Sequence, residues 1–169
     1  MGGGILPVAE HNGRIYLLFS RERKIFSTDK DRGKWSDFGG STEHNETQFE
    51  TAIREGVEEA AGLLGNKKQL ESALKSNTVG VIKNKKYSIW LLKVNYDQNI
   101  PDLFHNHFMH GVKHKASVVK KNNGLYEKDK LSWFNVNYLH QKSYLFRPFY
   151  KKYLPQIIKI AKTMKMSNR

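Results

Sequence analysis

The chain has 169 residues, enough for one domain with a sizeable hydrophobic core. Apolar residues make up 38% of the sequence and fall in short periodic runs, which excludes an intrinsically disordered chain. The sequence contains no cysteine, so disulfide bonds and thiolate metal sites are excluded. No apolar run is long enough to span a membrane, and the first residues lack the pattern of a signal peptide. We therefore expect one domain over residues 1–169, located in the cytoplasm and not in a membrane.

The net charge of +13 is unevenly distributed along the chain. Six of the 16 acidic residues lie between Glu43 and Glu59, where Arg54 is the only basic residue, so this segment carries −5. The rest of the chain carries +18. A small acidic site in a basic body would attract polyanions once metal ions filled the site. A solubilising surface is the alternative explanation, and for any single lysine it is the better one.

Two strands are expected at the start of the chain, at 5–10 and 14–20. The dipeptide Asn12-Gly13 between them predicts a tight hairpin turn, because both positions tolerate positive φ. A charged loop at 21–34 follows the second strand.

Three basic residues open this loop, where they could reach the phosphate groups of a bound substrate: Arg21, Arg23 and Lys24. A solvated loop is the alternative for each of them. After the loop, a short strand at 35–38 runs into Gly39-Gly40.

A helix is expected at 46–61. Thr47 and Glu50 form a capping box, so the helix should begin just after Thr47. Gly62 is the expected C-cap. Apolar residues at helical spacing define the buried face of this helix: Phe49, Ala52, Ile53, Val57 and Ala60.

Beyond the helix, strands are expected at 78–82 and 87–96 around the polar turn 83–86. The segment 101–123 is expected to be irregular, and a last strand is expected at 131–134. Strands mixed with helices predict an α/β sandwich. Four residues in the irregular segment invite a zinc site, with a flexible basic loop over the active site as the alternative: His105, His107, His110 and His114.

A basic helix is expected at about 147–166, with Pro148 near its start and Pro155 bending or splitting it. From residue 142 to residue 169 the chain has eight basic residues and no acidic one. These charges, with interleaved aromatic rings, could hold a nucleic acid strand through phosphate contacts and stacking. Docking of the helix onto the sheet is the alternative role of the same aromatic residues: Phe146, Phe149, Tyr150 and Tyr153.

Glu55, Glu58 and Glu59 stand at i, i+3 and i+4 and therefore share one side of the helix. Repulsion between these like charges costs the helix roughly 0.2–0.5 kcal/mol for each close pair. A purely structural helix gains nothing from such an arrangement. Hard divalent cations do require clustered oxygen ligands, and Mg²⁺ commonly combines a few carboxylates with water and substrate phosphates. On spacing alone, an acidic solvent face explains the three residues equally well.

The residues around these carboxylates favour a metal site. The run is Gly40, five residues, Glu46, seven residues, Arg54-Glu55, two residues, then Glu58-Glu59. It resembles the Nudix hydrolase signature, with six charged or glycine positions at fixed gaps. Outside this run the resemblance is looser.

The resemblance implies an α/β/α sandwich with a mixed sheet, acting as a hydrolase of phosphoanhydride bonds. Glu55, Glu58 and Glu59 would bind Mg²⁺, for which Mn²⁺ can substitute, and the metal would polarise a phosphoryl group and activate a water for in-line attack. In such enzymes an extra carboxylate from a distant loop often serves as ligand or base, and Glu127 is the candidate here. Glu55 and Glu59 are the other candidate catalytic carboxylates, and the sequence does not decide which group is the base.

The same resemblance implies structural roles. Arg54 would pair with Glu46 or a neighbouring carboxylate and hold the loop against the helix. Gly39 and Gly40 would allow the sharp loop before the helix.

Three departures from the family pattern leave every charged position in place. Ala61-Gly62 stands where a glycine followed by an aliphatic residue is usual. Gly56 stands where an aliphatic residue is usual, and it should weaken the helix by roughly 1 kcal/mol relative to Ala, although it also permits closer packing. Asp37-Phe38 precedes the two glycines, where Phe-Pro is commoner.

The expected substrate is a nucleotide-containing polyanion in which a nucleoside diphosphate is linked to another group. The basic body favours capped or 5′-phosphorylated RNA, and hence mRNA decapping, because other Nudix enzymes act on RNA caps. Dinucleoside polyphosphates, nucleotide sugars, nucleoside triphosphates and inositol pyrophosphates are the small-molecule alternatives. A non-catalytic RNA-binding module is a further alternative, although the intact carboxylates argue against it. Nothing in the sequence predicts an oligomeric state.

Overall fold

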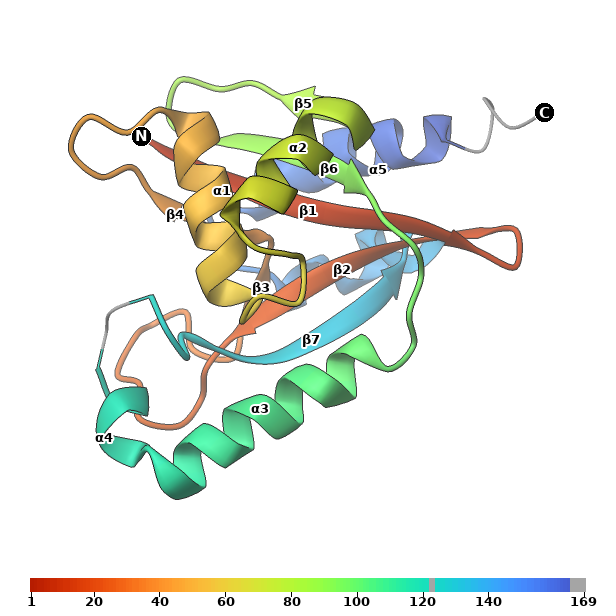
Figure 1. The fold of residues 1–169 in the computed structure, drawn as a ribbon. Helices are drawn as coiled ribbons and strands as arrows, with labels where there is room; N and C mark the ends of the chain where they lie inside the picture. Colours follow the sequence, from red (N-terminus) through yellow and green to blue (C-terminus); the bar gives the residue numbers. More distant parts are fainter. Residues whose placement is uncertain (122–123, 165–169) are drawn as a thin grey trace.

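A mixed sheet of seven strands forms the centre of the described chain (Figure 1). The computed structural model describes residues 1–121 and 124–164. The strand order is β3-β2-β1-β6-β5, with β4 also paired to β1 and β7 to β2. Only β1 and β6 run parallel within the described sheet. The strands are β1 Gly2–His11, β2 Arg14–Glu22, β3 Trp35–Ser36, β4 Phe38–Ser41, β5 Thr78–Ile82, β6 Ser88–Lys93 and β7 Lys128–Asn135.

Helices cover both faces of the sheet, so the predicted α/β/α sandwich with a mixed sheet is confirmed (Figure 1). Alternation along β1 sends Ile5 to one face, where it packs with α1 (Gln48–Glu59) and α2 (Lys67–Asn77). Leu6 and Val8 point to the opposite face, where α5 (Leu154–Thr163) packs. No helix in the described part of the chain is long and apolar enough to cross a membrane.

The N-terminal hairpin is confirmed. Asn12 and Gly13 have φ values of 50° and 70°, as the tight turn requires, and Val8 lies opposite Leu17. Strand β2 continues as far as Glu22, and its register against β7 shifts between Arg21 and Glu22. This irregularity lies directly before the loop that borders the functional site.

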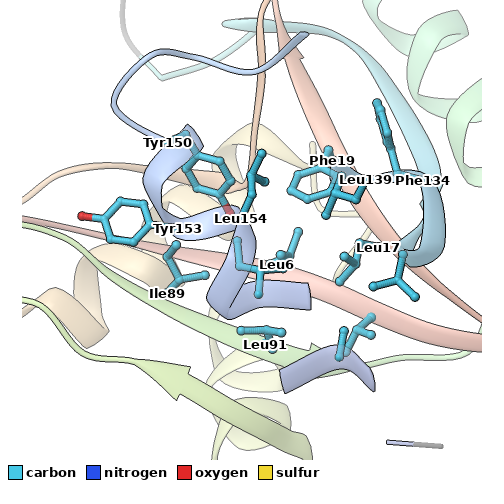
Figure 2. Packing of buried hydrophobic residues seen from close by; sticks show 14 of the residues in the cluster. Leu6, Leu17, Phe19, Ile89, Leu91, Phe134, Leu139, Tyr150, Tyr153 and Leu154 are labelled. Atoms are coloured by element: carbon cyan, nitrogen blue, oxygen red, sulfur yellow. The ribbon is translucent and has the colours of Figure 1, made fainter. Parts of the chain in front are cut away.

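The larger core cluster lies between the sheet and the C-terminal segment, and Figure 2 shows Tyr150 and Tyr153 inside it. Phe146 and Tyr150 have no exposed surface, and Tyr153 is 5% exposed. Nucleic acid stacking on these three rings is therefore wrong, because their faces are used to dock the segment onto the sheet. Phe149 is 39% exposed.

The segment predicted as irregular contains two helices, α3 (Ile100–His114) and α4 (Ala116–Val119). Pro101 lies in the first turn of α3, where its missing N–H costs nothing. Phe104, Phe108 and Gly111 form the buried stripe. The prediction was wrong because polar His and Lys residues on the other faces of α3 hide this narrow stripe.

The C-terminal helix begins later than predicted. Residues Lys151–Tyr153 form a 3₁₀ turn, and α5 begins at Leu154 with Pro155 in its first turn. Proline lacks an N–H and is tolerated only at that end, so it starts the helix rather than bending it. Helix α5 ends at Thr163, and the predicted continuation to 166 lies outside the described residues.

Candidate active site

Helix α1 begins as its capping box predicts. Thr47 Oγ1 accepts a hydrogen bond from Glu50 N, and Glu50 Oε2 accepts one from Thr47 N. The helix ends at Glu59, earlier than expected, because Ala61 and Gly62 both have left-handed backbones. Its last turn carries no basic residue, so the carboxylates there stand at the negative end of the helix dipole. A purely structural helix would not place them there.

The unusual Gly56 has a packing reason. A Cβ at Gly56 would lie 2.8 Å from Ile5 Cδ1 and 2.9 Å from Leu70 Cδ2. The glycine therefore lets α1 pack closely on both β1 and α2, which offsets its low helix propensity.

Arg54 organises the acidic segment. Its Nε and Nη2 donate to the two oxygens of Glu46 at 2.9 and 3.0 Å, and Nη2 also donates to Ser41 O at 3.1 Å. Its Nη1 donates to Glu55 Oε1 at 2.9 Å and lies 3.5 Å from Glu58 Oε2. The hydrogen bonds from Arg54 lower the pKa of Glu46 to about 2. Arg54 thus links the loop to the carboxylates of α1.

Four glutamates from three parts of the chain line one cavity of about 540 Å³: Glu22, Glu55, Glu59 and Glu127. Gly39 and Gly40, expected in a sharp loop, lie instead in strand β4, paired with Gly4 and Gly3 of β1, and they form part of the cavity wall. A Cβ at Gly40 would collide with the carboxylate of Glu55, and Gly39 N donates to Glu59 Oε2 at 2.7 Å. Burial raises the pKa of both Glu55 and Glu59, and the nearby cations Arg54 and Lys128 oppose this increase only in part.

A buried lysine lies behind the cavity. Lys128 on β7 is 1% exposed, and its Nζ is paired with Glu22 Oε1 and lies 3.3 Å from Glu59 Oε1. Arg147 extends this network, with Nη1 3.0 Å from Glu22 Oε1 and Nε 3.0 Å from Asp31 Oδ2. Despite its burial, the pKa of Lys128 is raised by these carboxylates, so the lysine stays charged.

Asp37, one of the departures from the family pattern, directly precedes β4 and is fully buried. Tyr87 Oη donates to Asp37 Oδ1 at 2.9 Å, while Asp37 Oδ2 has no hydrogen-bond partner in the described chain. Burial raises the pKa of Asp37 to about 7, although the Tyr87 hydrogen bond and the charge of Lys128 oppose the shift.

The two remaining predicted carboxylates lie at different parts of the site. Glu127 lines the cavity, and its Oε1 accepts from Gly124 N at 3.0 Å. The Glu58 side chain is 31% exposed, and it lines the neighbouring space beside α1 rather than this cavity.

The three basic residues predicted to bind substrate, at the end of β2 and just after it, differ in their position relative to the cavity. Arg23 lines the cavity, but its Nη1 donates to the backbone oxygens of Val119 and Tyr126. Arg21 is not among the lining residues, and its Nε donates to Asp129 Oδ1 at 2.7 Å. Lys24 does not line the cavity either. Their role in substrate binding stays a prediction.

An exposed aromatic residue also borders the cavity. Phe26 is 45% exposed and has a φ of 56°, which is uncommon for a bulky side chain. Lys120 Nζ lies 5.0 Å from the centroid of its ring, and both residues line the cavity. Together with Arg147, Lys120 places positive charge beside the four carboxylates.

In residues 1–121 and 124–164, no three His, Cys, Asp or Glu side chains are already arranged to hold a metal ion. Glu55, Glu58 and Glu59 on α1 each face a cation of the chain, either Arg54 or Lys128. The carboxylate oxygens of Glu55 and Glu59 nevertheless open onto one cavity, and oxygen is the ligand that hard divalent cations prefer.

The zinc interpretation of the histidines is not supported, since the same search of the described residues covers them. They lie on α3, which is a helix and not a flexible loop over the site. His107 stacks on Tyr126, with ring centroids 5.3 Å apart and planes 4° from parallel.

Sequence reasoning missed Glu22, Lys128 and Arg147. They come from β2, β7 and the segment before α5, and no local spacing connects them. The uninterrupted run Glu127-Lys128-Asp129 at the entry to β7 was the available signal, because charged residues that become buried in a strand require partners.

Comparison with solved structures identifies proteins of similar fold. The chain is similar to the Nudix hydrolase RenU from M. smegmatis, with a TM-score of 0.60 and 14% identity over 99% of this chain and 90% of that chain. It is also similar to a binary complex of the C. elegans Ap4A hydrolase, with a TM-score of 0.52 and 12% identity over 98% of this chain and 96% of that chain. No family model matches the chain, and no curated protein matches it. The resemblance predicted from the sequence is confirmed for the fold, which is the Nudix fold.

Proposed function

We propose that this chain with the Nudix fold is a Mg²⁺-dependent hydrolase that cleaves the phosphoanhydride bond of a nucleoside diphosphate linked to another group. One observation carries the proposal. Four glutamates line one cavity beside Gly39 and Gly40 of β4, and burial raises the pKa of two of them. Shifted carboxylates gathered in a cleft are typical of catalytic sites.

The donor set fits a hard divalent cation. Glu55, Glu58 and Glu59 would hold the metal, whose charge would relieve the crowding of their carboxylates. When bound, Mg²⁺ supplies Lewis-acid polarisation of the phosphoryl oxygens.

The chain's own residues would do the rest. Arg54 keeps Glu46 and Glu55 in place through hydrogen bonds, and Lys128 holds Glu59 through an ion pair. Glu127 opens onto the cavity and would accept the proton of the attacking water. Lys120 and Arg147 would attract the substrate phosphates, because both are basic and line the same cavity.

A small nucleotide is the first substrate class. The cavity volume of about 540 Å³ is within the range of roughly 300–1,000 Å³ typical of small-molecule sites. The C. elegans protein of similar fold is an Ap4A hydrolase, which makes dinucleoside polyphosphates the first compounds to assay.

The test is a hydrolysis assay with Mg²⁺ on a substrate panel. The panel contains a dinucleoside polyphosphate, a nucleotide sugar, a nucleoside triphosphate, an inositol pyrophosphate and capped RNA, with products separated by chromatography. We expect at least one nucleotide to be cleaved at an anhydride bond, and cleavage should stop with EDTA and resume with Mg²⁺ or Mn²⁺. Failure to cleave any of them would overturn the proposal.

Capped RNA is the second substrate class, supported by four exposed lysines at the C-terminal end: Lys151, Lys152, Lys159 and Lys162. Reversing their charge should weaken RNA binding and leave hydrolysis of a small nucleotide unchanged. RNA binding by the parent should fall with salt at a log–log slope of about −0.7 per neutralised phosphate. Equal processing of capped RNA by parent and variant would exclude this surface from RNA binding.

A further inference from the structure

A second cavity, of about 330 Å³, lies between α1 and α3. Figure 1 shows α1 above and α3 below the start of β7, and the residues that lead into this strand complete the wall. Its lining is mainly apolar and rich in aromatic rings: Val57, Ala61, Phe104, Phe108, Leu125 and Tyr126. A concave apolar site with a few polar groups at one end is typical of ligand binding.

Tyr126 is held firmly in this wall. One ring face stacks on His107, and Gly111 makes room for the ring, since a Cβ there would collide with it. Its backbone has a φ of 59°, an uncommon value for a bulky residue. Strain of this kind persists only where surrounding contacts enforce it, and it is concentrated at functional sites.

The apolar cavity adjoins the acidic cavity. Its charged lining residues are Glu58, Glu59 and Lys128, and Glu59 lines both cavities. The consecutive residues Tyr126 and Glu127 line different cavities, Tyr126 the apolar one and Glu127 the acidic one. A ligand group in the apolar cavity would therefore be a direct neighbour of phosphates at the carboxylates.

We propose that the cavity between α1 and α3 binds the nucleobase of the substrate, with Tyr126 as its aromatic wall. The identity of the ligand rests on the proposed function, in which the substrate carries a nucleoside. Planar rings pack favourably against the aromatic side chains that line this cavity. Its volume is at the small end of the range for ligand sites, which suits one ring system.

The test uses nucleoside monophosphates, which have no phosphoanhydride bond, so binding is measured without hydrolysis. AMP and GMP are titrated into the full chain with Mg²⁺ by calorimetry, and ribose 5-phosphate serves as the probe without a base. Tyr126→Asn removes the ring but keeps a residue that tolerates the left-handed backbone. We expect it to weaken binding of the preferred monophosphate by about 10-fold or more. Tyr126→Phe should bind like the parent, and neither change should alter ribose 5-phosphate binding.

Two controls separate stacking from general damage. Tyr138→Asn makes the same change at a 55% exposed tyrosine and should have no effect. Nuclear Overhauser contacts between base protons and the Tyr126 ring need no variant, so they test the inference even if Tyr126→Asn folds poorly.

Three results would overturn the inference. In the first, the base protons show no contact with Tyr126 and Tyr126→Asn binds AMP and GMP like the parent. In the second, Phe26→Ala abolishes binding while Tyr126→Asn does not, which would place the base on Phe26. In the third, a prenyl diphosphate binds better than either nucleotide, and Tyr126→Asn loses it. Tyr126-dependent AMP or GMP binding without any hydrolysis would instead overturn the proposed function and leave the base site standing.

Discussion

Lys128 Nζ lies 3.3 Å from Glu59 Oε1, at a place where neither side chain is more than 3% exposed. The same ammonium group is paired with Glu22. Ions removed from water in this way lose much hydration energy, so each depends on its partner. Glu59, a candidate catalytic carboxylate of α1, is thus held by a cation of β7.

Lys128→Met should lower the free energy of unfolding by about 3–5 kcal/mol, because it leaves Glu59 buried without its cation and Glu22 paired with Arg147 alone. The loss should be larger at pH 8 than at pH 5, where the unpaired carboxylate can take up a proton. Denaturant titration measures both values. Lys130→Met, on the exposed side of the same strand, is the matched control and should change little. Equal stability of the two variants would show that the buried pair is unimportant.

Glu58→Gln should reduce turnover of the substrate found in the panel by more than about 100-fold and raise the Mg²⁺ concentration needed. Even the mutation of a group that only supports a metal ligand typically lowers metal affinity or activity by about 10–100-fold. The fold should survive, because Glu58 is partly exposed and Arg54 approaches it only at 3.5 Å. Glu71→Gln on α2 is the control. Turnover like that of the parent in Glu58→Gln would remove Glu58 from the site.

Arg54→Ala should lower the free energy of unfolding at neutral pH by about 2 kcal/mol, through loss of charge-assisted hydrogen bonds to Glu46. Because Arg54 holds the pKa of Glu46 near 2, this stabilisation is present above about pH 4.5 and disappears as the pH falls towards 2. The two unfolding free energies should therefore converge in acid. Arg54→Lys should recover only part of the loss, since lysine cannot donate in the same fork. Full recovery by lysine would show that charge alone matters.

Asp37→Asn should abolish one pH dependence of stability. Between about pH 4 and pH 7 the folded protein keeps a proton on Asp37 that the unfolded chain has released, so stability falls as the pH rises. A shift from 3.8 to about 7 corresponds to about 4 kcal/mol. Between pH 4 and pH 7 the unfolding free energy of the parent should therefore fall by up to that amount relative to that of Asp37→Asn. Above this range the difference between the two proteins should stay constant. The control Asp102→Asn, at an exposed position, should show the same change of unfolding free energy with pH as the parent.

Local patterns predicted the parts of the fold that depend on neighbouring residues. The Asn12-Gly13 turn and the Thr47–Glu50 capping box formed where expected. Each depends only on the backbone conformation or hydrogen bonds of residues that are close in sequence. Helix α3 was missed, since its buried stripe is hidden among polar residues. Alternation along β2 could not predict which residues at its end face the site, because the register against β7 shifts between Arg21 and Glu22.

The candidate site was predicted only where it is continuous in sequence. The arrangement of Arg54 with Glu46 and Glu55 follows from the fixed spacing of these residues in one sequence motif. Lys128 and Arg147 could not be predicted, since their pairing with Glu22 depends on how distant strands and segments meet in the sheet.

The ion network around Glu22 also has a consequence for folding kinetics. Glu22 is separated from Lys128 by 106 residues and from Arg147 by 125 residues. Closing loops of that length costs entropy before the contacts are gained, so such contacts form slowly. On the ribosome, Glu22 emerges long before either cation. The acidic cavity therefore becomes complete only after Arg147 has been synthesised, and metal binding should report that this segment has reached its place.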